Sequence, residues 1–167
     1  MQKNVLSEIA LYYGDVTMPK NWDIDRDELQ QNILTSNLTD SSFPFTKTWD
    51  MLNTYIREHI NVEFEITLIN RQTWGNVYKP AETTTPLLNV DPVDLRHSPD
   101  FTMLYGVNVK NCMVRIYYDH NRRKGRSWDI SLENNKFIMF PSTCMYYITN
   151  NQQDRLNFVQ TITYEYI

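Results

Sequence analysis

The chain has 167 residues, of which 41% are hydrophobic and 13% aromatic. That length fits one domain, and we expect residues 1–167 to form a single domain, mostly helical over 1–60 and rich in strands over 61–167. The net charge of −4 argues against nucleic acid and against an anionic membrane surface as a partner. No apolar run reaches membrane-spanning length, and the first residues lack a signal-peptide pattern, so we expect synthesis in the cytoplasm.

The first helical pattern covers residues 23–37. Asp23 or Asp25 can serve as its N-cap, and acidic residues fill its first turn, where the helix dipole favours negative charge. Leu29 and Ile33 lie four residues apart, which places them on one face of the helix. These features predict a helix that packs one apolar stripe against the rest of the chain.

A second helical pattern follows over residues 46–60, after a polar stretch. Trp49, Leu52 and Ile56 fall on one face, and Thr46 is a candidate N-cap. The pattern predicts another amphipathic helix.

Strand patterns fill the remainder of the chain. Residues 61–69 alternate between apolar and polar side chains and predict a half-buried strand. The polar stretches 71–86 and 89–100 predict loops. Six further strands are predicted over 101–109, 112–119, 127–131, 136–140, 145–149 and 155–167. Helices followed by many short antiparallel strands predict an α+β fold, with N-terminal helices packed on an antiparallel barrel or jelly roll.

The two cysteines, Cys112 and Cys144, both lie in apolar, strand-like sequence. We expect two buried, reduced thiols and no disulfide.

Two stretches resemble the iron(II)- and 2-oxoglutarate-dependent oxygenases, whose fold is a double-stranded β-helix, or jelly roll, backed by helices. The segment NKFIMFPSTCMYYITNN, residues 135–151, resembles the part of that family that carries its second iron-binding His. The segment RLNFVQTITYEYI, residues 155–167, resembles the final strand, which carries an Arg for the cosubstrate. In the family, His-x-Asp and the second His bind iron(II) on one face, and the Arg pairs with 2-oxoglutarate.

The resemblance places the family positions on specific residues of this chain. Arg155 takes the position of the Arg, and Tyr146, nine residues earlier, that of the second His. Asn89 and Asp91 take the positions of His-x-Asp. An amide and a neutral phenol replace the two imidazoles, and a phenol ionises only near pH 10. We therefore expect a degenerate oxygenase site at Asn89, Asp91, Tyr146 and Arg155, without catalysis, metal or cofactor.

An alternative alignment keeps the chemistry. His97, Asp100 and His120 form a possible iron(II) triad, although the two histidines are closer in sequence than the family pattern requires. In that reading the chain is an iron(II)/2-oxoglutarate-dependent dioxygenase that hydroxylates a protein. A loop His and a turn His without metal is the simpler interpretation of these residues.

The only dense positive run, at the tip of a predicted hairpin, is a candidate contact with an acidic surface on another subunit. It consists of Arg122, Arg123, Lys124 and Arg126. The apolar segment 5–19 is a candidate arm onto a neighbour, and the final strand, which stays strand-like to Ile167, is a candidate sheet edge for a partner.

The segments YYGDVTMPK, TWGNVYKP, NRRKGRSWDI and TITYEYI resemble small proteins of tailed bacteriophages, especially marine contractile-tailed ones. This resemblance implies a virion protein of the neck or tail that is made in the host cytoplasm. Its expected partners are other phage structural proteins and further copies of the chain, as a homo-oligomer or ring subunit.

Overall fold

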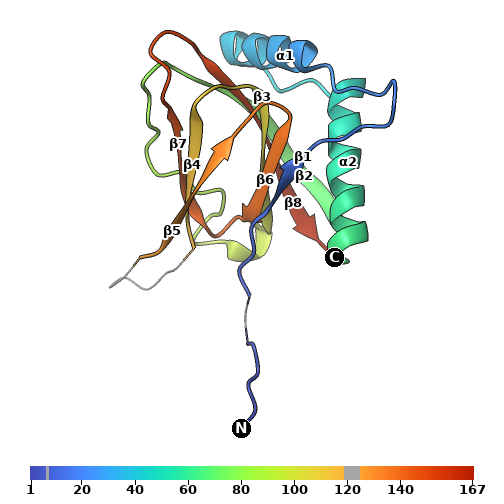
Figure 1. The fold of residues 1–167 in the computed structure, drawn as a ribbon, viewed down its shortest axis with the longest axis vertical. Helices are drawn as coiled ribbons and strands as arrows, with labels where there is room; N and C mark the ends of the chain where they lie inside the picture. The colour runs from blue at the N-terminus through green and yellow to red at the C-terminus, as the bar shows by residue number, and fades with distance from the viewer. Residues whose placement is uncertain (7, 119–124) are drawn as a thin grey trace.

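A computed structural model describes residues 1–6, 8–118 and 125–167 (Figure 1). The helices are α1 (Arg26–Thr39) and α2 (Lys47–Phe64), with a short 3₁₀ turn at Leu95–His97. The strands are β1 (Tyr12–Asp15), β2 (Leu68–Tyr78), β3 (Phe101–Asn108), β4 (Cys112–Tyr117), β5 (Ser127–Leu132), β6 (Lys136–Pro141), β7 (Met145–Asn150) and β8 (Asn157–Tyr166).

The strands form two antiparallel sheets. The larger has the order β1-β6-β3-β8-β2, and the smaller has the order β5-β4-β7. The helices lie on one side of the larger sheet and the smaller sheet on the other (Figure 1). The prediction of an α+β fold with N-terminal helices on an antiparallel jelly roll is confirmed.

Alternating side chains divide the interior into two apolar layers. On β3, Met103 and Tyr105 join the layer between the larger sheet and the helices. Leu104, between them in sequence, joins the layer between the two sheets. Successive strand side chains point to opposite faces, so β3 contributes to both cores and reads as a nearly continuous buried run. The layer between the sheets is the interior of the barrel.

Both predicted helices form, with the expected caps. The carboxylate of Asp25 accepts a hydrogen bond from the backbone N–H of Glu28, at 3.0 Å. The hydroxyl of Thr46 accepts one from Trp49, at 3.3 Å. These bonds satisfy backbone donors that the first helical turn leaves unpaired.

The predicted strand over residues 61–69 is wrong in its first part, because α2 continues through Phe64. Glu65 then ends the helix in a left-handed conformation. Strand β2 begins only at Leu68, which pairs with Tyr166 near the end of β8. Just before β2, the backbone carbonyl of Thr67 accepts a hydrogen bond from the Ile167 N–H, at 3.0 Å.

The predicted loop over 71–86 is wrong in its first half, because β2 runs to Tyr78. One of its polar side chains, that of Thr73, is hydrogen-bonded to α2 and to the neighbouring strand β8. The indole N–H of Trp49 on α2 donates to the hydroxyl of Thr73, at 3.1 Å. The side-chain amide of Gln160 on β8 donates to the same hydroxyl, at 2.6 Å. Tertiary hydrogen bonds therefore stabilise a strand that its polar sequence does not predict.

Both ends of the chain differ from expectation. Part of the predicted N-terminal arm, Tyr12–Asp15, forms β1 and pairs with β6 of its own sheet. The final strand, β8, is not a sheet edge, because it lies between β3 and β2. The N-terminal segment before β1 extends away from the body (Figure 1).

Cys112 and Cys144 are both buried free thiols, as predicted. Burial raises the pKa of the Cys112 thiol to about 12. Neither helix of the described chain is long and apolar enough to cross a membrane.

Candidate functional site

Four polar side chains form a hydrogen-bonded chain at one end of the barrel, which we call the Asn89 network. The side-chain amide of Asn89 donates to the Tyr146 hydroxyl, at 3.0 Å, and to the Thr102 hydroxyl, at 3.1 Å. The hydroxyls of Thr102 and Ser142 are hydrogen-bonded at 2.8 Å. The structure therefore brings Asn89 and Tyr146, which are distant in sequence, into direct contact.

Backbone pairing positions the network. Leu87 and Tyr146 exchange both of their backbone hydrogen bonds, at 2.9 and 3.0 Å, so the segment before Asn89 runs along β7. Thr102 is the second residue of β3, and the next residue, Met103, points toward the helices. Successive strand side chains point to opposite faces, so Thr102 faces the barrel interior. Ser142 follows β6, and its hydroxyl meets that of Thr102. Each member is thus held by a strand or by a segment paired with one.

The side chain of Tyr146 is buried in the barrel interior. Its residue is 3% exposed, and its ring packs edge-on against Phe140 of β6, with ring centroids 5.0 Å apart. Burial raises the pKa of the Tyr146 phenol, and the hydrogen bond from Asn89 opposes that shift only in part. The phenol is therefore neutral at ordinary pH, and a neutral phenol is a poor ligand for iron(II).

The other two residues of the predicted degenerate site are exposed and do not bond to Asn89 or Tyr146. The carboxylate of Asp91 accepts a hydrogen bond from the backbone N–H of Val93, at 2.9 Å, which is a local turn typical of Asp. Arg155 lies in the segment before β8, where its backbone carbonyl accepts a hydrogen bond from the Asn150 side chain, at 2.8 Å. The site predicted from the resemblance is thus divided between a buried pair and two surface residues.

The alternative triad is not assembled in the described part of the chain. His97 is exposed, and its Nδ1 lies 2.9 Å from the carboxylate of Asp94. The carboxylate of Asp100 accepts a hydrogen bond from the backbone N–H of Tyr166, at 3.0 Å. His120 lies outside the described residues. Within those residues, no group of three or more His, Cys, Asp or Glu side chains is placed to hold a metal ion.

The predicted basic contact falls mostly outside the described residues, which exclude Arg122, Arg123 and Lys124. Arg126 is described and exposed, and its backbone carbonyl accepts a hydrogen bond from the Tyr118 N–H, at 3.1 Å. This bond closes the base of the β4–β5 hairpin.

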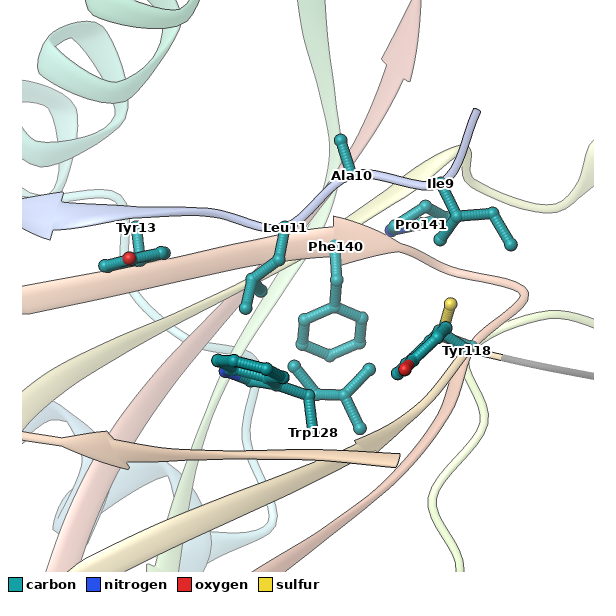
Figure 2. Close-up of a pocket in the computed structure, with 10 residues that line it drawn as sticks. Ile9, Ala10, Leu11, Tyr13, Tyr118, Trp128, Phe140 and Pro141 are labelled. Carbon is teal, nitrogen blue, oxygen red and sulfur yellow. The ribbon is translucent and has the colours of Figure 1, made fainter. Parts of the chain in front are cut away.

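Sequence patterns did not predict an apolar pocket at the open side of the barrel (Figure 2). It has a volume of about 280 Å³ and is lined by Ile9, Ala10, Leu11, Tyr13, Ile116, Tyr118, Trp128, Phe140, Pro141 and Cys144. Phe140 contacts both this pocket and Tyr146, so the pocket lies next to the Asn89 network. The residues come from four strands and from the segments next to them, and only their meeting in space creates the pocket.

Solved structures of similar fold come from oxygenases. A prolyl-4-hydroxylase from Pseudomonas putida has a TM-score of 0.65 at 12% identity, covering 93% of this chain and 87% of that one. A viral collagen prolyl hydroxylase from Paramecium Bursaria Chlorella virus-1 has a TM-score of 0.64 at 13% identity, covering 92% and 94%. The non-heme alpha ketoglutarate dependent epimerase SnoN from nogalamycin biosynthesis has a TM-score of 0.65 at 8% identity, covering 92% and 76%.

These likenesses show that the chain has the jelly-roll fold of the 2-oxoglutarate oxygenases. No family model matches the sequence, and no curated protein matches it. The fold similarity therefore extends over nearly the whole chain without a detectable sequence relationship to a characterised family.

The residues at the Asn89 network do not fit iron(II) and 2-oxoglutarate. Every buried polar residue that the structure describes is a Ser, Thr, Asn or Gln. A dicarboxylate taken into the barrel would need a cationic partner to offset its desolvation, and the described interior offers none. The hydroxyl of Thr161 on β8 is buried without a hydrogen-bond partner, but one neutral hydroxyl cannot balance that charge.

Proposed function

We propose that this chain is a non-catalytic protein that uses an oxygenase-like jelly roll for contacts with other proteins. The contact between Asn89 and Tyr146 carries the proposal. These residues replace the two imidazoles of the family pattern, and they bond to each other in a neutral, closed network. The Asn89 side-chain N–H₂ donates to two hydroxyls, those of Tyr146 and Thr102, so this donor is already paired within the protein.

A titration with iron(II) and 2-oxoglutarate under anaerobic conditions tests the proposal. An assembled site gives a weak visible charge-transfer band, because the cosubstrate chelates an iron that has open positions. We expect no saturable band from this protein while its circular dichroism shows a folded chain. A 2-oxoglutarate oxygenase of the same fold provides the positive control. A saturable band from this protein would contradict the proposal.

The finer proposal is a structural component of a tailed-phage particle, in the neck or tail. It rests on the resemblance of short sequence segments to phage proteins. It implies location in the virion after synthesis in the host cytoplasm, and partners among phage structural proteins or further copies of this chain. Mass spectrometry of purified particles tests it, with the chain expected at a stoichiometry of several copies. Absence from intact particles, despite presence in the infected cell, would contradict this finer proposal.

The basic run supports a contact in such an assembly. Arg122→Glu and Arg123→Glu together reverse two charges, so we expect weaker binding to an acidic partner surface and less salt dependence of what remains. A Lys20→Glu/Lys79→Glu variant makes the same change in net charge elsewhere on the chain. Equal binding by the two variants would exclude the basic run as the contact.

A second candidate function is an iron(II)/2-oxoglutarate-dependent protein hydroxylase. Its support is the near-complete coverage of a prolyl-4-hydroxylase structure by this fold. It requires His97, Asp100 and His120 to assemble around iron(II), with Arg155 on the cosubstrate. Succinate release from 2-oxoglutarate in the presence of candidate protein substrates tests it. His97→Ala should abolish that release, whereas His59→Ala should leave it unchanged.

A further inference from the structure

The open side of the barrel has two unpaired strand edges with an apolar pocket between them. Among the described residues, β1 is the last strand of the larger sheet and pairs only with β6. In the same part of the chain, β5 is the last strand of the smaller sheet and pairs only with β4. Leu11, just before β1, and Trp128 of β5 lie on opposite sides of the pocket, and the Phe140 ring lies beside them (Figure 2). Such edges can accept an added extended segment, because a strand at the end of a sheet has backbone groups without a strand partner. On β1 the Asp15 carbonyl already accepts a hydrogen bond from the Tyr55 hydroxyl, at 3.1 Å, so the remaining backbone groups are the ones available.

The pocket is built for apolar side chains. Its lining includes the large rings of Trp128, Tyr118 and Phe140, together with the thiol of Cys144. Trp128 is still 59% exposed, although it lies beside Ile116 on the inner face of the smaller sheet. Covering the indole would therefore bury a large apolar surface that the single chain leaves in water.

The N-terminal arm, residues Met1–Leu6, has the complementary property. It is extended and runs away from the body (Figure 1), and Ile9, Ala10 and Leu11, a few residues further along the chain, line the pocket. Its apolar residues are almost fully solvated, with Val5 at 71% and Leu6 at 95% exposed. Six extended residues span up to about 20 Å, which is enough to reach a pocket on an adjoining molecule.

The arm's own pocket is not the site for it. Ile9, Ala10 and Leu11 already form one wall of that pocket, and the chain before them runs outward. A second copy presents the same pocket with the same two free edges. Reciprocal exchange would bury both arms in one symmetric contact, which is the common form of a homodimer.

We propose that the N-terminal arm of one copy docks in the pocket between β1 and β5 of a second copy. Val5 and Leu6 enter beside Trp128, and the arm's backbone pairs with a free strand edge. This inference rests on the proposed protein-contact function and names its partner as the chain itself.

Sedimentation of the full chain tests the proposal. We expect a mass of at least two chains, which falls to one chain in a Val5→Asp/Leu6→Asp variant, because carboxylates cannot enter an apolar pocket unpaired. Leu38→Asp is the control, since Leu38 is 83% exposed and α1 lies at the end of the molecule away from the arm (Figure 1). It should leave the mass unchanged.

The pocket side is tested by Trp128→Asp, which should also give single chains. An equal mixture of Trp128→Asp and Val5→Asp/Leu6→Asp chains retains one intact arm and one intact pocket per pair. Partial recovery of two-chain mass in that mixture alone would support exchange. In the full chain, Trp128 fluorescence, taken as the difference from Trp128→Phe, should shift to shorter wavelength as the protein is concentrated.

A full chain that stays monomeric at its highest soluble concentration would overturn the proposal. So would an oligomer that the arm variant leaves intact, and so would a monomer whose pocket binds a small apolar dye. The iron(II) titration of the same preparations separates the two levels of inference. A charge-transfer band contradicts the non-catalytic function, whereas loss of arm-dependent mass contradicts only the exchange.

Discussion

The hydrogen bond between Asn89 and Tyr146 predicts a measurable coupling between these residues. Tyr146→Phe removes the hydroxyl, but the Asn89 amide retains Thr102 as an acceptor at 3.1 Å. The expected loss is therefore one net hydrogen bond, about 1 kcal/mol of the free energy of unfolding. Asn89→Ala leaves the buried phenol and Thr102 without this donor, and should cost about 2 kcal/mol.

The double variant isolates the bond itself. If the two residues interact directly, Asn89→Ala/Tyr146→Phe should cost about 1 kcal/mol less than the two single losses added together. Urea unfolding at neutral pH measures all four proteins, and the slope with denaturant should not change between them. For a chain of this size, 1 kcal/mol corresponds to about 2–4 °C in Tm.

Tyr147→Phe is the matched control for this cycle. Tyr147 is the next residue on β7 and points to the opposite face, where its ring packs against Tyr117. Its hydroxyl has no hydrogen bond to Asn89, so coupling between Tyr147→Phe and Asn89→Ala should be near zero. Additive losses in the Tyr146 cycle would refute the closed network, and with it the argument that the Asn89 donor is already paired within the protein.

Three further predictions concern the scaffold. Gly106→Ala should prevent folding or lower the free energy of unfolding by at least about 3 kcal/mol, because the added Cβ would lie 2.0 Å from the backbone oxygen of Glu133. Gly125→Ala is the control: its Cβ would meet nothing within 4 Å, so urea unfolding should show almost no change. Burial raises the pKa values of Cys112 and of several tyrosines above their unfolded values, because these groups must stay neutral to remain buried. Stability should therefore fall as pH rises above about 9. The urea midpoint, followed from pH 7 to alkaline pH, checks this. Hydrogen bonds from Arg115 lower the pKa of Asp129. The stabilisation from this ion pair is therefore present above the unfolded carboxyl pKa near 3.9 and is lost as pH falls through the folded value. Asp129→Asn should make unfolding by acid slightly less pH-dependent, and the effect is small because both groups are exposed.

Local patterns predicted most of the fold. The caps at Asp25 and Thr46 are interactions within one turn, and they mark where the helices begin. The six C-terminal strands follow period-two or continuous apolar runs between Asn- and Gly-rich turns. These signals involve residues that are close in sequence, so they can be detected in a single sequence.

The errors arise where distant segments decide. Residues 61–67 alternate like a strand, but α2 continues through Phe64, and β2 pairs with β8 only from Leu68 onward. Residues 71–78 are polar like a loop, but Thr73 is satisfied by Trp49 and Gln160 from two other elements. Neither fact is present in the local sequence.

The site divides in the same way. The contact between Asn89 and Tyr146 depends on the pairing of Leu87 with β7, which only a comparison with a known fold could suggest. Asp91 forms a local turn with Val93, as Asp commonly does in loops. Arg155 is an exposed residue in the segment before β8.

A jelly roll that fills its own barrel still has an open side. In this chain, Tyr146 and Phe140 are buried against each other in the interior next to the network. The unpaired edges of β1 and β5 and the exposed Trp128 remain, and they are stabilised most by an extended apolar segment. The same chain supplies such a segment beside the pocket. The proposed edge contact depends on these free edges and on Trp128, so it stands or falls independently of whether the interior binds a cofactor.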